Sequence, residues 1–478
     1  MRWCWPILLA LLVGCNPTRK VLEDYERNLR GGSFVAAAEV VESKANKKNG
    51  DELLWRLMTG NARLLSGESE KAIEQFDLAE DIFAKNDNAS VFSATTREAY
   101  SMLSNDMAFA YNGTGQDRIF CCMYKAIDYA LHQRNNAART EFNRAYEHQE
   151  NWLFERRRDI VAADKALEKD ARKYAKDKNL ADDNYGDSAN LALRNPEFAA
   201  KFAEIYGFSP QSSANLRDLA VGEYSNAYLS HLCGVFRWLN GDNGRDFIRD
   251  AVRYNGGCSV IHNDLKDASS GKIPTDSVWI FVEDGLCPYR EEVRFDLPLG
   301  VFGGIGSYVP YVGIALPRLV YRGVGANSYV ATAGGQSYPL EVLQNVDVLL
   351  QTEFKVYMRG AVRREITRCL VKAASQAALG IAAHNTKDSN ARLALYLAQA
   401  AVVSWSAATT IADLRCWTGL PKRVLVQRIQ RPDDGKIVLT ADFQSLAMEV
   451  PSGNSIIWIR KVAPESPLVM KMVNNMKQ

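Results

Sequence analysis

The sequence predicts an α+β protein with an all-helical, tetratricopeptide-like N-terminal array and a C-terminal α+β domain. Residues 20–255 are rich in Ala, Leu, Glu, Lys and Arg and place apolar residues at helical spacing. From residue 275 onward, short β-branched and aromatic runs are bounded by turn residues. The 47% apolar and 24% charged content is typical of a globular protein. We therefore expect four segments: a lipoprotein signal peptide (1–14), a helical domain (15–255), a linker (256–274) and an α+β domain (275–478).

The first residues predict export and lipid attachment. Arg2 precedes an apolar run that ends at Val13; it is too short to span a bilayer, which needs about 20 apolar residues, but it fits a signal peptide. The exit, Leu12-Val13-Gly14-Cys15, resembles the bacterial lipobox, which implies acylation of Cys15 and cleavage before it. Asn16 then resembles an outer-membrane sorting signal, so we expect a lipid anchor on the periplasmic face of the outer membrane. An ordinary secretory signal or a buried N-terminal strand is the alternative.

Small and aromatic residues in the helical half predict stacked helix pairs. Small residues let two antiparallel helices approach, Gly67 ends the first helix, and an aromatic residue fills the groove. The residues with these roles are Gly60, Gly67, Ala72, Phe76 and Ala79 in a first unit and Ala126, Ala138, Phe142 and Ala145 in a second. The stretch from Ser93 to Tyr111 is interpreted as a degenerate repeat, and the stretch from Tyr224 to Ala251 as an imperfect one. Mixed charges from Trp152 to Lys178, with Arg156-Arg157-Arg158, predict a solvated helix face or a patch for an acidic partner or lipid head group.

The C-terminal half predicts strands around a helical insertion. Two helices are expected, from about Val342 to Ala383 and from Ala391 to Ile411. Gln399, Ser404 and Ser406 interrupt the second, so we expect a buried, closely packed helix rather than a membrane span. The expected strands are Ser277–Val282, Glu292–Leu297, Gly313–Pro317, Ser328–Thr332, Val424–Gln430, Lys436–Ala441 and Ser455–Val462. We expect the first and last of them to share one sheet.

The net charge bears on nucleic-acid binding, and the cysteine content bears on disulfide formation. The formal charge of +2 becomes +1 when Arg2 leaves with the signal, so no basic field favours nucleic acid. Without Cys4, and with Cys15 lipidated, seven cysteines remain, and no two form a CxxC pair. Their apolar surroundings predict buried thiols, although an oxidising periplasm leaves one or two disulfides open. The seven are Cys121, Cys122, Cys233, Cys258, Cys287, Cys369 and Cys416.

Short motifs in the C-terminal half carry a resemblance. They are Phe281-Val282-Glu283-Asp284-Gly285-Leu286 with Pro288, Gly313-Ile314-Ala315-Leu316-Pro317, Ile366-Thr367-Arg368, and Ala412-Asp413-Leu414-Arg415-Cys416-Trp417 with Leu420-Pro421. This set resembles an uncharacterised bacterial lipoprotein family with tetratricopeptide-like helices and the same α+β region, over nearly the whole mature chain. The weak repeats, and Cys416 in place of a small polar residue, depart from the family. The resemblance implies an envelope lipoprotein that acts beside other small lipoproteins in cell-wall or outer-membrane assembly, and it implies no reaction.

Residues with catalytic potential form no convincing site, and we expect no cofactor and no metal. The five histidines lack metal-ligand spacing. Cys258 and His262-Asn263-Asp264 lie in an expected loop without a positioned activator. Gly303-Gly304-Ile305-Gly306 lacks the Lys-Ser/Thr of a phosphate loop, and Glu283 and Asp284 are interpreted as turn residues.

Asp413, Arg415 and Trp417 form the most distinctive polar group. On an expected helix end, they would hold an inter-domain ion pair with Arg368 or form a recognition edge.

The leading function hypothesis is a non-enzymatic, membrane-anchored periplasmic scaffold that binds a protein segment in the concave face of its helical array. Two alternatives stay open: an envelope enzyme that acts on peptidoglycan, and a subunit of a secretion or surface-assembly complex. A polar cleft around Glu283 or Asp413 would favour the enzyme.

Overall fold

The computed structural model describes residues 17–47, 49–92, 110–152, 193, 195–210, 221–298 and 311–474. Within them the predicted α+β class is confirmed, with helices in the N-terminal half and sheets in the C-terminal half. Several sequence predictions fall outside the described residues. They are the signal peptide and Cys15, most of the degenerate repeat after Ser93, the Arg156-Arg157-Arg158 stretch and the Gly303–Gly306 segment.

The N-terminal half is a succession of antiparallel helices. Its elements are α2 (Pro17–Arg30), α3 (Phe34–Ala45), α4 (Glu52–Ser66), α5 (Ser69–Phe92), α7 (Gly115–Leu131), a helix over residues 135–152, α10 (Pro196–Tyr206), the 3-10 turn η2 (Val221–Glu223), α12 (Ala227–Leu239), α13 (Arg245–Tyr254) and α14 (Ser259–Ser269). The linker expected over 256–274 is therefore wrong in its central part, because α14 occupies it. Its apolar residues Val260 and Ile261 are buried against the sheet side of the array.

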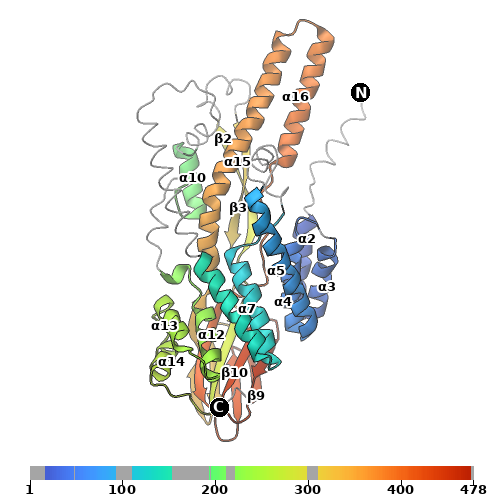
Figure 1. Cartoon of the computed structure of the whole chain (residues 1–478). Coiled ribbons are helices and arrows are strands. Elements are labelled where there is room, and N and C mark those ends of the chain that lie inside the picture. Colours follow the sequence, from blue (N-terminus) through green and yellow to red (C-terminus); the bar gives the residue numbers. More distant parts are fainter. Residues whose placement is uncertain are drawn as a thin grey trace.

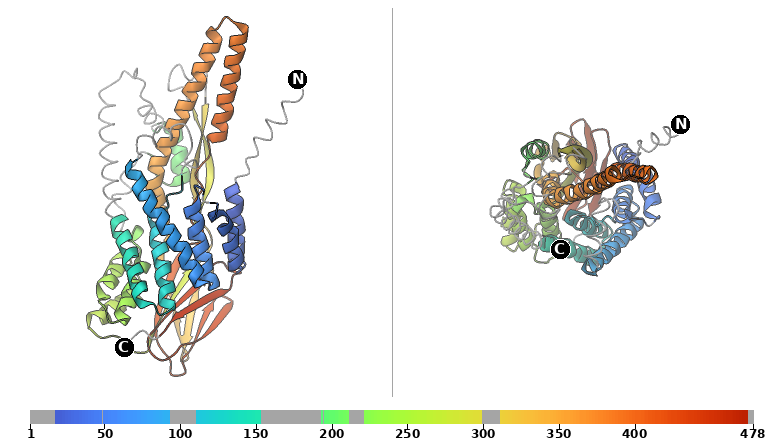
Figure 2. Two further views of the ribbon diagram at one scale, coloured as in Figure 1. Left: turned by 45° about the vertical axis from the view of Figure 1, so that its right-hand side comes forward. Right: turned by 90° about the horizontal axis from the view of Figure 1, so that it is seen from above.

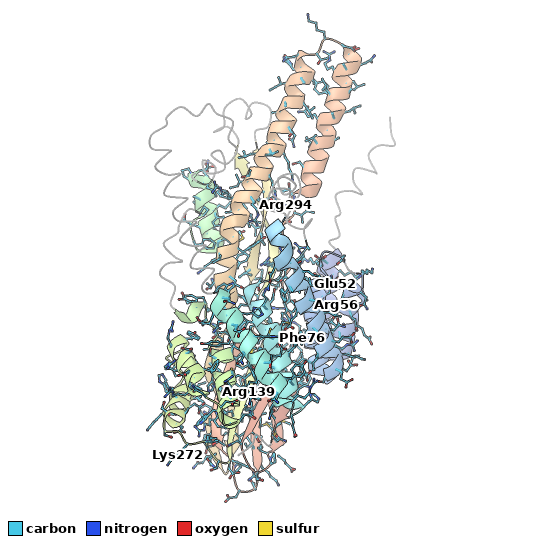
Figure 3. All side chains as sticks on the ribbon, viewed as in Figure 1. Glu52, Arg56, Phe76, Arg139, Lys272 and Arg294 are labelled. Atoms are coloured by element: carbon cyan, nitrogen blue, oxygen red, sulfur yellow. The ribbon has the colours of Figure 1, made fainter. Side chains whose placement is uncertain are left out.

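The residues named for packing between helix pairs lie in the interior of the helical half. A Cβ added to Gly60 on α4 would lie 2.6 Å from the ring of Phe76 on α5, so this crossing requires a glycine; Phe76 is labelled in Figure 3. Gly67 ends α4 in the left-handed region, at φ 84°. The other residues named for packing are all buried: Ala72, Phe76, Ala79, Ala126, Ala138, Phe142 and Ala145. That these pairs are tetratricopeptide repeats stays a prediction.

The C-terminal half contains two sheets, a long hairpin and two long helices. Its elements are β1 (Ser277–Asp284), β2 (Tyr289–Pro298), β3 (Tyr311–Val320), β4 (Tyr329–Ala333), β5 (Gln336–Pro339), β6 (Glu341–Asn345), α15 (Val346–Asn385), α16 (Ser389–Thr409), β7 (Arg423–Gln430), β8 (Lys436–Ala441), β9 (Gln444–Glu449), β10 (Ser455–Lys461) and β11 (Leu468–Val473). The central sheet has the order β11-β10-β1-β7-β6, a second sheet has the order β5-β4-β8-β9, and β2 pairs with β3. The first and last predicted strands, now β1 and β10, are parallel neighbours, as expected.

The central sheet is covered on both faces, so β1 is buried along its whole length. Trp279 and Phe281 belong to a core shared with the N-terminal helices. Val278, Ile280 and Val282 alternate with them and belong to the core shared with the second sheet. This alternation is the two-residue period of a strand, with both faces dry.

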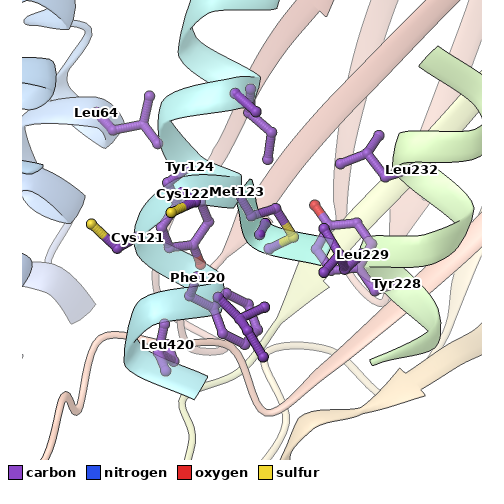
Figure 4. Packing of buried hydrophobic residues seen from close by; sticks show 14 of the residues in the cluster. Leu64, Phe120, Cys121, Cys122, Met123, Tyr124, Tyr228, Leu229, Leu232 and Leu420 are labelled. Atoms are coloured by element: carbon purple, nitrogen blue, oxygen red, sulfur yellow. The ribbon is translucent and has the colours of Figure 1, made fainter. Parts of the chain in front are cut away.

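The N-terminal helices pack on the central sheet rather than standing apart from it. One apolar core runs from α2–α7 and α12–α14 into β1, β7 and β10. Figure 4 shows Met123 of α7 and Tyr228 and Leu229 of α12 directed into the space between these helices. The array therefore packs against the protein's own sheet through this core, and the binding of a protein segment by its concave face stays a prediction.

Helices α15 and α16 form an arm that extends away from the body (Figures 1 and 2). The 40 residues of α15 correspond to about 60 Å of helix. Its first half packs on α10 and the β2–β3 hairpin, through Phe354, Met358 and Ile366. The second half meets α16 beyond the body. The expectation that residues 391–411 form a buried helix is wrong, because most of α16 faces solvent.

Candidate functional site

Glu283 and Asp284 lie at the end of β1, not in the turn that we expected, and both side chains are fully buried. The strand continues through them because their partners come from other elements. Glu283 stands beside Arg460 and Asp284 beside Lys461 in the parallel β1–β10 register. These two carboxyl groups point to opposite faces of the sheet.

Glu283 joins the sheet to the helical array. It accepts hydrogen bonds from the hydroxyl groups of Tyr124, at 3.0 Å, and Tyr228, at 3.1 Å. The Arg460 guanidinium lies 3.9 Å from the carboxylate and donates to the Glu283 and Gly285 carbonyl oxygens. Burial raises the pKa of Glu283, and the charge of Arg460 opposes that rise. The carboxyl group is closed to solvent, and its hydrogen bonds connect the sheet to α7 and α12.

Asp284 organises the loop on the opposite face of the sheet. One carboxylate oxygen accepts hydrogen bonds from the backbone N–H groups of Gly325 and Ala326 and from the Tyr329 hydroxyl, at 2.7–3.1 Å. The other oxygen pairs with Arg423 at 2.8 Å. A Cβ at Gly325 would lie 2.6 Å from the carboxylate, so the close approach of this loop explains the glycine.

Asp413, Arg415 and Trp417 lie on an extended segment, not on a helix end, because α16 ends at Thr409. Arg415 pairs with Asp413 at 2.8 Å and, across the molecule, with Asp51 at 2.9 Å. Asp51 precedes α4. The expected inter-domain ion pair therefore exists, but its partners are Arg415 and Asp51.

Trp417 also packs where the N-terminal helices meet the central sheet. Its ring centroid lies 6.4 Å from that of Phe76 and 5.9 Å from that of Tyr124. Arg368 lies elsewhere, on α15, where it contacts Glu365 at 3.3 Å. Arg368 and Asp413 line one crevice of about 10 Å³, too narrow for a ligand.

A larger cleft of about 410 Å³ opens between α2, the β2–β3 hairpin and residues 414–418. This volume lies in the range of small-molecule sites. Arg322 forms its wall: it contacts Glu26 at 2.7 Å and donates to the Cys287 and Thr418 carbonyl oxygens. None of the described residues that line the cleft is histidine, cysteine or serine. Its lining combines the cationic side chains of Arg19, Arg30 and Arg322 with the carboxyl groups of Glu23, Glu26 and Glu291.

The cysteine and histidine residues weighed in the sequence do not form a nucleophilic site. Asp264 on α14 is buried and binds His231 at 2.7 Å and the Trp279 indole at 2.9 Å. His262 instead contacts the Gly256 carbonyl oxygen. Cys258 is buried, and burial raises its pKa to about 11, so its thiol is protonated at neutral pH.

One cluster of potential metal ligands occurs in the described part of the chain. The ligand atoms of Glu80, Cys122 and Glu141 all lie within 4.8 Å of one another. The ammonium group of Lys125 contacts Glu80 at 2.8 Å and Glu141 at 3.3 Å, so a positive charge is already present among these carboxylates. Burial raises the pKa of the Cys122 thiol well above its ordinary value. The cluster therefore includes an ion-pair network between α5, α7 and the helix over residues 135–152.

The seven described cysteines are free, and six of them are buried, as their apolar surroundings predicted. Sequence reasoning missed the residues that contact the Glu283 carboxylate: Tyr124, Tyr228 and Arg460. The one signal for Arg460 is its position directly after an apolar strand run, Ile456-Ile457-Trp458-Ile459.

No family model, curated protein or solved structure matches this chain. Within the described residues, no helix combines the length and apolar character that crossing a bilayer requires. The arm formed by α15 and α16, which we call the α15–α16 hairpin, exposes several large apolar side chains of α16.

Proposed function

We propose that this protein is a membrane-anchored lipoprotein of the bacterial envelope that acts as a non-enzymatic scaffold and binds a protein partner through the α15–α16 hairpin. The lipobox-like sequence ending at Cys15 supports the anchor and its periplasmic, outer-membrane location. The proposal places the binding element on the α15–α16 hairpin rather than on the helical array, because the array shares its apolar core with the sheet.

One observation carries the binding role. Leu393, Tyr396, Leu397 and Val403 on α16 are 58%, 48%, 63% and 48% exposed. At 3.6 residues per turn they lie within about 120° of one another around the helix axis, so they share one face of the helix. Single exposed apolar residues are common, but a continuous exposed apolar face marks an interaction surface.

The anchor is tested by metabolic labelling with an alkyne-bearing palmitate. We expect the full chain to incorporate the label and to sediment with membranes, whereas Cys15→Ser is unlabelled and leaves the membrane fraction. Equal labelling and sedimentation of the two chains would overturn the anchor.

The binding role is tested by crosslinking intact cells that express the wild type or Leu393→Ser/Leu397→Ser. Both side chains are exposed, so the double variant keeps its fold, and we expect it to lose the crosslinked adducts. Phe443→Ser is the matched control, because Phe443 is a fully exposed apolar residue between β8 and β9. Adducts that persist in the hairpin variant, or that disappear equally in the control, contradict the proposal.

A further inference from the structure

Helix α16 is apolar on both of its faces. The face toward α15 carries the partly buried residues Leu395, Ala398 and Val402. The outer face, which we call the α16 stripe, carries Leu393, Tyr396, Leu397 and Val403. A helix that is apolar all round is ordinarily enclosed in a core or a membrane. The intramolecular contact with α15 encloses only half of this helix.

The same hairpin presents a complementary surface on α15. Ser375, Ala378 and Ala382 are exposed and lie three or four residues apart; we call these three residues the α15 stripe. The exposed Ile381 lies at its border. The side chains of the three stripe residues are short, so they leave a shallow groove into which larger side chains of a neighbouring helix can fit. Large residues thus mark one outer face of the hairpin and small residues the other.

Charge does not oppose contact between these two faces. From Ala373 to Thr409 the charged residues are Lys387, Asp388 and Arg392, all at or next to the connection between the helices. Neither stripe carries a charge. Two copies can therefore bring the stripes together without desolvating an ion.

We propose that the α16 stripe of one copy of this chain packs against the α15 stripe of the next copy. The two faces differ, so the contact is heterologous. Each hairpin then contacts one neighbouring copy through α15 and another through α16, and repetition of this contact gives a ring or a row of copies. This inference rests on the proposed function in one respect: lipid anchors hold the copies in the same orientation, with their hairpins side by side.

The area of the proposed contact indicates whether copies assemble in solution or only at the membrane. A contact along the 21 residues of α16 and one helix diameter wide covers roughly 300 Å² on each copy. Stable interfaces cover about 800 Å² per partner, so one such contact is weak. Two contacts per hairpin, and the raised effective concentration of copies tethered to one membrane, favour assembly at the membrane over assembly in solution.

The two stripes lie at the same level along the hairpin, so contact between them can be tested by a disulfide crosslink. Gln399 of α16 donates to the Gln376 carbonyl oxygen of α15 at 3.2 Å, so Ala378 and Leu397 lie at a similar level along the hairpin. Cells would express two full-length chains with different tags, one with Ala378→Cys and one with Leu397→Cys. Copper phenanthroline then oxidises paired thiols to a disulfide. We expect a crosslinked species that carries both tags.

The control pairs Leu397→Cys with Val35→Cys, which places an exposed thiol on α3, remote from the hairpin; this pair should give no mixed-tag species. Crosslinks between two Leu397→Cys chains, without the Ala378–Leu397 product, would overturn the heterologous contact.

A photo-crosslinking residue in place of Leu397 identifies which molecule contacts the α16 stripe. Transfer to a second copy supports the inference, whereas transfer to phospholipid or to a different protein overturns it. The proposed function fails by other signs, namely an unlabelled Cys15 or hairpin-independent adducts, so the two failures are distinguishable.

Discussion

Individual residues show why glycine and buried carboxyl groups recur at the contacts between elements. Gly60 occupies a point where the α4 backbone touches an aromatic ring, and Gly325 one where a loop backbone touches Asp284. Glu283 holds two tyrosines of the array on the sheet. In each case the residue type is explained by a side chain from another helix or strand that lies in contact with it.

Gly60→Ala should destabilise the protein. The added methyl group would lie 2.6 Å from the buried Phe76 ring, and overpacking of this kind costs about 1–3 kcal/mol. Gly256→Ala is the control, because its nearest neighbour is 3.9 Å away, and its effect should stay within about 0.5 kcal/mol. Urea denaturation measures both. Equal midpoints for Gly60→Ala and the wild type would contradict the close packing.

Glu283 should make the folded state less stable as pH rises. Burial raises its pKa above the ordinary 4.5, so the folded protein binds this proton more tightly than the unfolded chain. The contribution is complete below pH 4.5 and is lost as pH rises through the folded pKa. Glu283→Gln, which cannot ionise, should lose less stability than the wild type when urea midpoints are compared from about pH 4 to about pH 8.

Glu291→Gln is the control of opposite sign. A hydrogen bond from Tyr289 lowers the pKa of Glu291 below 4.5, so its contribution is present above that value and is lost as pH falls through the folded pKa. The same pH trend in both variants would show that neither carboxyl group governs it.

At the scale of elements, the extended segment after α16 links the two halves of the chain. Arg415 is buried and reaches both Asp413 and Asp51. Trp417, two residues on, enters the core between Phe76 and Tyr124. The segment needs no helix, because its side chains are held by partners on α4, α5 and α7.

Arg415→Ala should destabilise the protein by about 3–5 kcal/mol, since it leaves two carboxylates without their buried cation. Arg318→Ala, which removes a half-exposed partner of Glu291, should cost about 0–1 kcal/mol. Thermal denaturation followed by circular dichroism compares them. A small effect of Arg415→Ala would mean that water replaces the pair.

For the whole molecule, the shared core predicts cooperative unfolding. The helices of the N-terminal half and strands β1, β7 and β10 bury one another, so neither half keeps its core alone. We expect far-ultraviolet circular dichroism and tryptophan fluorescence to report the same urea midpoint. A fragment that ends at residue 270 should fail to form stable helices. Two separated transitions, or a folded fragment, would contradict this coupling.

The local features of this fold could be predicted from the sequence, because they depend on neighbours along the chain. Apolar periodicity located α4, α5, α7 and the two long C-terminal helices, and β-branched runs located β1, β7 and β10. Gly67 marked a helix end through its own backbone freedom. Buried cysteines followed from their apolar surroundings.

Periodicity tells which face of an element is apolar, but not what covers that face. For this reason the packing of the array on the sheet was not expected, and α16 was expected to be buried although most of its described side chains are exposed. The partners of Glu283 and Arg415 likewise come from positions far away in the chain, Tyr124 and Asp51. Long-range pairing is decided by the packing of whole elements, so only the tertiary structure placed these groups together and left the hairpin uncovered.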